Sequence, residues 1–272
     1  VKVQYSLQAY GQALKKKNGG VEYEFSTHPD GTLKYLVIAV SGAREIFAKS
    51  QQIVYIDCAH LKSVEGNLLN AEREYIKPVM VAMTSRTFNK NNHVLVRKHL
   101  TQKTNHSNTK YNKQVFGVGD SENSDLIDAA IDVAVKAGVA LNAQNIVVMS
   151  DRGSAILKSV PSKLPLAIHV YCAVHLCRNL EEKKIPRCFT YLFWAARNAE
   201  SLYAHEVAME NMKEECPNMF SYLSAINGVW AIHSLIANDI PIYEIQSSNS
   251  VEQVFGLPVI LEGRKQLPVT LL

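Results

Sequence analysis

Short apolar runs of strand length come first along the chain, and segments with helical periodicity follow them. Strands are predicted where β-branched and aromatic residues cluster, at residues 51–57, 66–71, 77–84, 93–96 and 114–118. Apolar residues then recur at helical intervals over 124–141, and the polar residues ahead of them can cap this helix. Further strands are predicted at 145–150 and 166–171, separated by a short helix that begins near Ser154 and is expected to end at Pro161. This order predicts an α/β fold built on a mixed sheet with flanking helices.

Beyond about residue 172 the pattern becomes entirely helical. Helices are predicted over 189–199, 204–215 and 219–227, and residues 247–249 resemble a further helix start that places Glu252 in a first turn. The first fifty residues carry one helical and one alternating pattern, which we interpret as a lead-in. The expected organisation is a lead-in at 1–50, the first part of a core at 51–175, an all-helical insertion at 176–245, and a core helix with a third carboxylate at 246–272.

Two of the predicted strands end in the same way. The run at 51–57 ends in Asp57, and the run at 145–150 is followed directly by Asp151. In a mixed sheet of this kind these two strands are expected to be neighbours, so their carboxylates would lie side by side. Their mutual repulsion is relieved by a hard divalent cation, which a third carboxylate such as Glu252 would help to hold. Each acid also has a structural interpretation, as a turn residue, a helix cap or a partner of a helix dipole.

The composition limits the class of protein. With 272 residues and 47% hydrophobic residues, the chain can bury a large core. Its longest apolar stretches are far shorter than the roughly 18 residues that span a bilayer, so no membrane segment is expected. The five cysteines are odd in number and unevenly spaced, which favours a reducing compartment over a disulfide framework.

The net charge of +4 is concentrated in one segment. Residues 86–113 contain no acidic residue and seven basic ones: Arg86, Lys90, Arg97, Lys98, Lys103, Lys110 and Lys113. Such a segment attracts a phosphate backbone without regard to base sequence, through counterion release. A solvated loop that keeps the protein soluble explains the same composition. Both interpretations stay open at this point.

Several short blocks between about residue 35 and the end of the chain form a specific combination. They are Tyr55–Ser63 with Gly66–Leu69, Ser121–Asn123, Met149–Gly153, Cys172–Leu180, Ser248–Glu252 and, further on, Arg264. In this order and spacing they resemble the catalytic domain of Mutator-like element transposases. The chain departs from that pattern at Ala59, where a Thr is usual, at Gln253, where a Ser is frequent, and in lacking a Trp after Asn123.

The resemblance implies an RNase H-like fold, interrupted by an all-α insertion ahead of the helix that bears the last Glu. It implies a DDE-type transposase in which Asp57, Asp151 and Glu252 hold two Mg²⁺ or Mn²⁺ ions that assist DNA cleavage and strand transfer. Cys172 and His175 match the CxxH pair of the family and are expected near this site. The implied partners are transposon terminal inverted repeats, target DNA and further copies of the chain, in the nucleus.

Six residues are candidates for DNA contacts. They are Arg97, Lys98, Lys103, Arg152, Arg178 and Trp230. The basic side chains suit phosphates, and an aromatic residue in the helical insertion suits stacking on a flipped base. Of the two tryptophans in that insertion, we expect Trp194 to be core and Trp230 to be the functional one.

Three alternatives are weighed against this assignment. A zinc site formed by Cys172, His175, Cys177 and Cys188 has suitable ligand types, but not the spacing of a finger or a ribbon. A Cys172 nucleophile with His175 as its base lacks an evident orienting partner. A domesticated or decayed relative that binds DNA and regulates transcription without cutting is the third, since a recently decayed element keeps its carboxylates.

Overall fold

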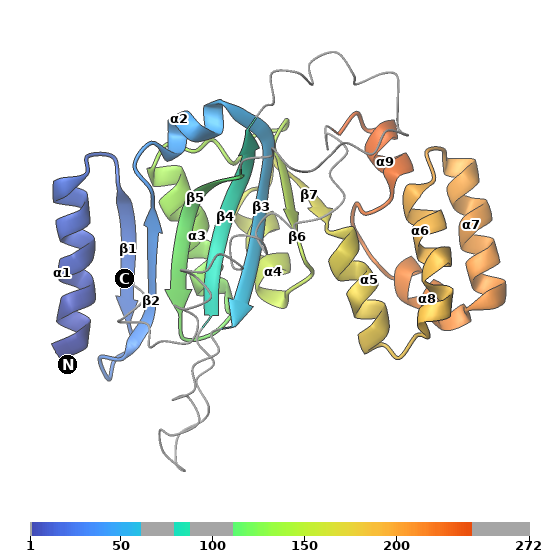
Figure 1. Ribbon diagram of the computed structural model, residues 1–272, viewed down its shortest axis with the longest axis horizontal. Helices are drawn as coiled ribbons and strands as arrows, with labels where there is room; N and C mark the ends of the chain where they lie inside the picture. The colour runs from blue at the N-terminus through green and yellow to red at the C-terminus, as the bar shows by residue number, and fades with distance from the viewer. Residues whose placement is uncertain (1, 61–78, 88–110, 241–272) are drawn as a thin grey trace, which may run out of the picture.

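A seven-stranded mixed sheet with flanking helices forms the body of the molecule (Figure 1). The structure is a computed structural model that describes residues 2–60, 79–87 and 111–240. The strands are β1 (Glu22–Thr27), β2 (Leu33–Ala39), β3 (Ser50–His60), β4 (Val79–Thr87), β5 (Tyr111–Gly119), β6 (Val147–Ser150) and β7 (Ile168–Tyr171). The helices around the sheet are α1 (Lys2–Lys17), α2 (Ala43–Ala48), α3 (Ser124–Lys136) and α4 (Ser154–Lys163). The α/β fold with a mixed sheet and flanking helices is therefore confirmed.

The strand order is β1-β2-β5-β4-β3-β6-β7. Strands β1 to β5 pair with their neighbours in antiparallel fashion, whereas β3 pairs with β6, and β6 with β7, in parallel. The four residues from Ile53 to Ile56 in β3 are all completely buried. A strand that is covered on both faces needs a continuous apolar run of this kind, which explains its position in the middle of the sheet.

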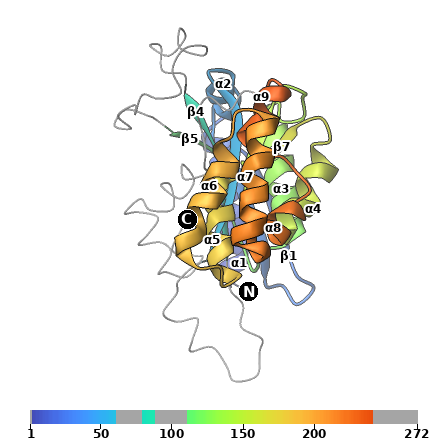
Figure 2. The same cartoon turned by 90° about the vertical axis from the view of Figure 1, so that its right-hand side faces the viewer.

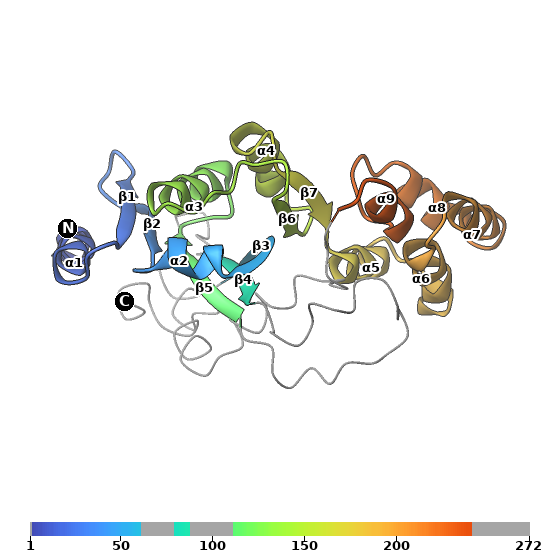
Figure 3. The same cartoon turned by 90° about the horizontal axis from the view of Figure 1, so that it is seen from above.

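Helices cover the two faces of the sheet unequally. Helices α3 and α4 lie together on one face, as the view from above shows (Figure 3), and α2 adds Phe47 to the same apolar cluster. Helix α3 is capped by Asn123, whose Oδ1 accepts a hydrogen bond of 3.0 Å from the N–H of Leu126. The opposite face packs against Leu235 and Ile240, which lie in and just after the last described helix, Ile232–Ala237. Two apolar layers thus enclose β3 and β6.

A helical module extends from the β7 edge of the sheet (Figure 1), and its helices face the viewer in Figure 2. It comprises α5 (Ala173–Glu182), a 3₁₀ turn (Arg187–Phe189), α6 (Thr190–Asn198), α7 (Leu202–Glu215), α8 (Pro217–Ser224) and α9 (Ile232–Ala237). The module has an apolar core of its own. Its chain returns to the sheet at Val229, whose carbonyl accepts a hydrogen bond of 2.9 Å from the N–H of Tyr171. The part of the module from α5 to α8 therefore starts and ends at the edge of the sheet, and α9 follows the return point.

Several predicted boundaries differ from the structure. Residues 22–39 form β1 and β2, which pair within the sheet, so the stretch 1–50 is more than a lead-in. Strand β3 continues three residues beyond Asp57, and α4 continues past Pro161 to Lys163. The predicted strands at 66–71 and 93–96, and the predicted helix at 246–272, lie outside the described residues.

The partly buried ring of His169 in β7 should make stability depend on pH. Burial lowers its pKa from 6.5 to about 4, and its Nε2 lies 2.7 Å from the hydroxyl of Ser150. The unfolded chain binds a proton below 6.5 that the folded chain does not bind, so the free energy of unfolding should fall as the pH drops from 6.5 to about 4. Urea unfolding of wild type and His169→Gln across this range measures the effect. Equal pH slopes in the two proteins would contradict the assignment.

Candidate functional site

Asp57 and Asp151 lie side by side at the point where the parallel pairing of β3 and β6 ends. In the β3–β6 register Ile56 is opposite Ser150, and each aspartate is the next residue along its chain. Asp57 is 3% exposed, and its Oδ1 accepts a hydrogen bond of 2.9 Å from the N–H of Cys58. The Oδ1 of Asp151 accepts one of 3.0 Å from the N–H of Gly153. The predicted juxtaposition of these two acids is therefore present.

A third carboxylate, that of Glu122, lies beside Asp151. A methyl group placed on Gly153 would lie 2.5 Å from Oε1 of Glu122 and 3.3 Å from Oδ1 of Asp151, so both acids crowd over the same glycine. The charges of Glu122, Asp57 and Asp151, together with the larger effect of burial, raise the pKa of Cys58. Glu122 precedes Asn123, the cap of α3, and the sequence offered only a capping role for this stretch. Its place in the Ser121–Asn123 block of the resemblance was the one feature of the sequence that could have indicated a role at the site.

His175, from the first turns of α5, supplies a positive charge to this group of acids. Burial by itself lowers its pKa, but a hydrogen bond to Cys172 and the negative charges of Cys172, Asp57 and Asp151 outweigh burial and raise the pKa to about 9. The imidazole is therefore protonated at neutral pH and partly compensates the two aspartates. Cys172 and His175 lie next to the acids, where the resemblance implied them.

The described carboxylates supply oxygen ligands of the type that Mg²⁺ and Mn²⁺ prefer. Within residues 2–60, 79–87 and 111–240, however, no group of three or more His, Cys, Asp or Glu side chains is arranged to hold a metal ion. The four residues of the zinc alternative belong to this part of the chain, and Cys188 is exposed while Cys172 is buried. That alternative is therefore not supported. Glu252, the predicted third ligand, lies outside the described residues.

Both tryptophans of the helical module belong to its apolar cluster, Trp230 as a buried member and Trp194 as a partly buried ring packed against it. Trp230 is only 6% exposed, and its ring stacks on Phe193 with centroids 6.0 Å apart. The ring of His205 contacts it edge-on, with centroids 5.5 Å apart. Trp194 is the less buried of the two and packs at the margin of the same cluster. In this arrangement the Trp230 ring is enclosed by side chains and has no face open to a base, so its predicted stacking on DNA is corrected.

The basic candidates for DNA contacts fall into separate places. Arg178 is exposed on α5, whereas Arg152 is partly buried and its guanidinium lies against two tyrosine rings. The contacts predicted for Arg97, Lys98 and Lys103 lie outside the described residues.

Arg197 in α6 is a buried cation that the sequence did not indicate. It is 0% exposed, and its three guanidinium nitrogens have no hydrogen-bond partner in the described part of the chain. Burial lowers its pKa to about 10, while the negative charge of Cys172 acts in the opposite direction. A second positive charge therefore acts on Cys172, in addition to that of His175.

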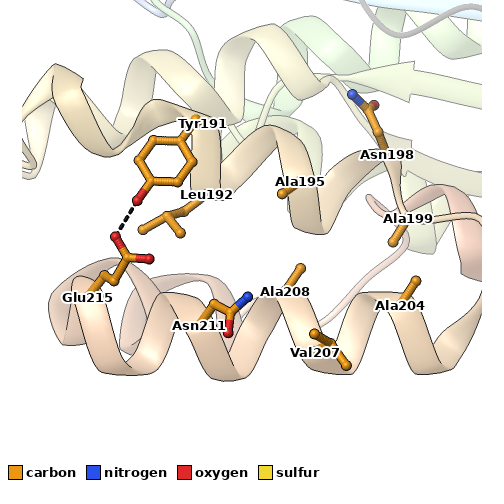
Figure 4. A pocket seen from close by; sticks show the side chains of 10 residues that line it. All are labelled: Tyr191, Leu192, Ala195, Asn198, Ala199, Ala204, Val207, Ala208, Asn211 and Glu215. Atoms are coloured by element: carbon orange, nitrogen blue, oxygen red, sulfur yellow. Dashed lines mark hydrogen bonds between the residues drawn. The ribbon is translucent and has the colours of Figure 1, made fainter.

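A shallow groove lies elsewhere, between α6 and α7 (Figure 4). Alanines line much of it, and at one end the hydroxyl of Tyr191 donates a hydrogen bond to Glu215. None of its lining residues belongs to the acid group around Asp57.

No protein-family model matches the chain, and no curated protein sequence matches it either. In addition, the described segments include no helix that is long and apolar enough to cross a bilayer.

The buried Trp230 leads to a prediction of stability. Trp230→Ala should lower the free energy of unfolding by about 3–5 kcal/mol, the usual effect of removing a large aromatic side chain from a core. Trp194→Ala, in the same module, should have a smaller effect because that ring is only partly buried. Urea unfolding of the two variants measures the difference. A larger effect of Trp194→Ala would show that the module is packed differently.

Proposed function

We propose that the chain is the catalytic core of a DDE-type DNA transposase with an RNase H-like fold, akin to Mutator-like element transposases. The observation that carries the proposal is the parallel pairing of β3 with β6, because it brings Asp57 and Asp151 to one end of neighbouring strands. Acids in this position are suited to phosphoryl transfer assisted by divalent ions. DNA as a partner, a nuclear location and self-association remain predictions of the same resemblance.

The order of elements supports the fold part of the proposal. Three antiparallel strands, β3 to β5, are followed by α3, β6, α4 and β7, with the two later strands parallel to β3. This is the order expected of an RNase H-like core. The helical module then follows β7 and precedes the segment that contains Glu252, which is the place that the resemblance gives to the all-α insertion.

Asp57 and Asp151 are the described residues that would hold the divalent ions. When bound, a pair of such ions supplies activation of the attacking oxygen and stabilisation of the leaving oxygen at phosphorus. Asp57 is fixed by its hydrogen bond from Cys58, and Asp151 by that from Gly153, so both carboxylates are oriented in advance. The protonated His175 offsets their repulsion in the absence of other cations.

The first test of this function uses Asp151→Asn, which keeps the shape of the side chain and removes its charge. Wild type should bind Mn²⁺ and nick supercoiled plasmid DNA in its presence, and the variant should lose both activities. Asp132→Asn is the matched control, because Asp132 is a partly exposed residue of α3 that pairs with Lys163. Equal nicking by wild type and Asp151→Asn would sink the mechanism. Mn²⁺-independent DNA binding with no nicking by any of the proteins would favour the non-cutting regulator.

A second test identifies the third ligand. The resemblance assigns it to Glu252, whereas Glu122 is the acid that the described structure places beside Asp151. We expect Glu252→Gln to abolish nicking and Glu122→Gln to leave measurable activity with weaker Mn²⁺ binding, because Glu122 acts on the site from its edge. Mn²⁺ titration and plasmid nicking of both variants give the answer. The opposite result would transfer the ligand role to Glu122.

A further inference from the structure

Arg152 joins the segment that carries Asp151 to the helical module. Its Nη1 donates a hydrogen bond of 3.1 Å to the hydroxyl of Tyr222 in α8. Its Cζ lies 5.7 Å from the ring centroid of Tyr171 and 5.8 Å from that of Tyr222, within the range of cation–π contacts. Its Nε is buried and has no hydrogen-bond partner among the described residues. Two tyrosine rings thus hold this guanidinium.

The two rings are themselves fixed by other parts of the chain. The hydroxyl of Tyr171 donates a hydrogen bond of 3.0 Å to the carbonyl of Asn227. Its ring lies so close to Gly228 that a Cβ there would be 2.4 Å from a ring carbon, and the φ of Gly228, 149°, suits glycine. The hydroxyl of Tyr222 also accepts a hydrogen bond of 3.4 Å from Asn179 in α5. Arg152 is therefore held by residues from β7, α5 and α8, and its position depends on how the module is seated.

Along the backbone, Arg152 lies between two residues at the acid group. Asp151 precedes it, and Gly153, which donates to Asp151 and lies against Glu122, follows it. A displacement of the Arg152 side chain is transmitted through one peptide unit to each neighbour, and the peptide units are stiff. A change in the backbone torsions of Arg152 therefore alters the geometry of the hydrogen bond from Gly153 to Asp151.

We propose that Arg152 is a positioning residue that couples the seating of the helical module, through Tyr222, to the orientation of Asp151. The expected effect on DNA cleavage rests on the proposed function. The link between Tyr222, Arg152 and Asp151 can be tested without any activity. A direct contact between Arg152 and a DNA phosphate is the competing role. The hydroxyl of Tyr222 distinguishes the two roles of Arg152. It is needed if Arg152 positions Asp151, and it is not needed if Arg152 contacts a phosphate.

Hydrogen–deuterium exchange of the full chain tests the coupling without DNA. Tyr222→Phe keeps the ring and removes the hydroxyl that accepts from Arg152 and Asn179. We expect faster exchange in the peptide that covers residues 150–154, although the substitution is in α8. Tyr191→Phe is the matched control, because it removes a hydroxyl from the same module whose partner is Glu215. Unchanged exchange at 150–154 in Tyr222→Phe would overturn the proposal, whatever the activity of the protein.

Plasmid nicking with Mn²⁺ then separates positioning from DNA contact. Tyr222→Phe and Arg152→Lys should each slow single-turnover nicking by roughly tenfold or more, which corresponds to the loss of one hydrogen bond to a charged group, with unchanged affinity for DNA. The double variant should be no slower than Arg152→Lys alone, because both changes break one interaction. If Arg152 instead contacts phosphate, Arg152→Lys retains most activity and Tyr222→Phe has no effect.

The two proposals fail in different ways. If wild type does not nick DNA, the proposed function fails, and the exchange experiment still decides whether Arg152 links the module to Asp151. If wild type nicks DNA and Tyr222→Phe behaves as wild type in both measurements, the function stands and the positioning role is wrong.

Discussion

The burial of β3 on both faces, between an antiparallel and a parallel neighbour, is the constraint on which the rest of the structure depends. Its apolar run excludes water from both faces, and Asp57 follows that run directly with a side chain that is only 3% exposed. A parallel neighbour requires a crossover, and α3 together with the connections around it provides this crossover. Because parallel strands share their direction, the chain delivers Asp151 to the end of the sheet where Asp57 already lies.

Acids gathered in this way need positive charge, and the helical module delivers it. His175, in the first helix after β7, interacts with Asp57 and Asp151, whereas Arg197, one helix further along, acts on Cys172. Although burial opposes it, Cys172 and the two aspartates raise the pKa of His175, because they stabilise the protonated imidazole. The helix that carries His175 packs into the core of the module, so the electrostatic balance of the acid group depends on the packing of helices that contain none of the acids.

Local patterns in the sequence predicted most elements, because periodicity reports directly which face of a helix or strand is buried. They did not reveal that β2 pairs with β5, since that pairing joins segments about eighty residues apart and leaves no local trace. Glu122 was missed for a related reason. The polar stretch that contains it is explained locally by the helix cap at Asn123, and nothing in that stretch indicates the tertiary contact of Glu122 with the acid group. Trp230 was misassigned because the enclosure of its ring depends on partners from α6 and α7.

The return of the chain at Val229 has a consequence for variation of the module. Tyr171 and Val229 are hydrogen-bonded neighbours, so the chain leaves the sheet and re-enters it at adjacent points. An insertion whose ends lie together can change in length or internal arrangement without altering the register of any strand. Loops between α5 and α8 are therefore free to diverge, provided that Tyr222 keeps its place against Arg152.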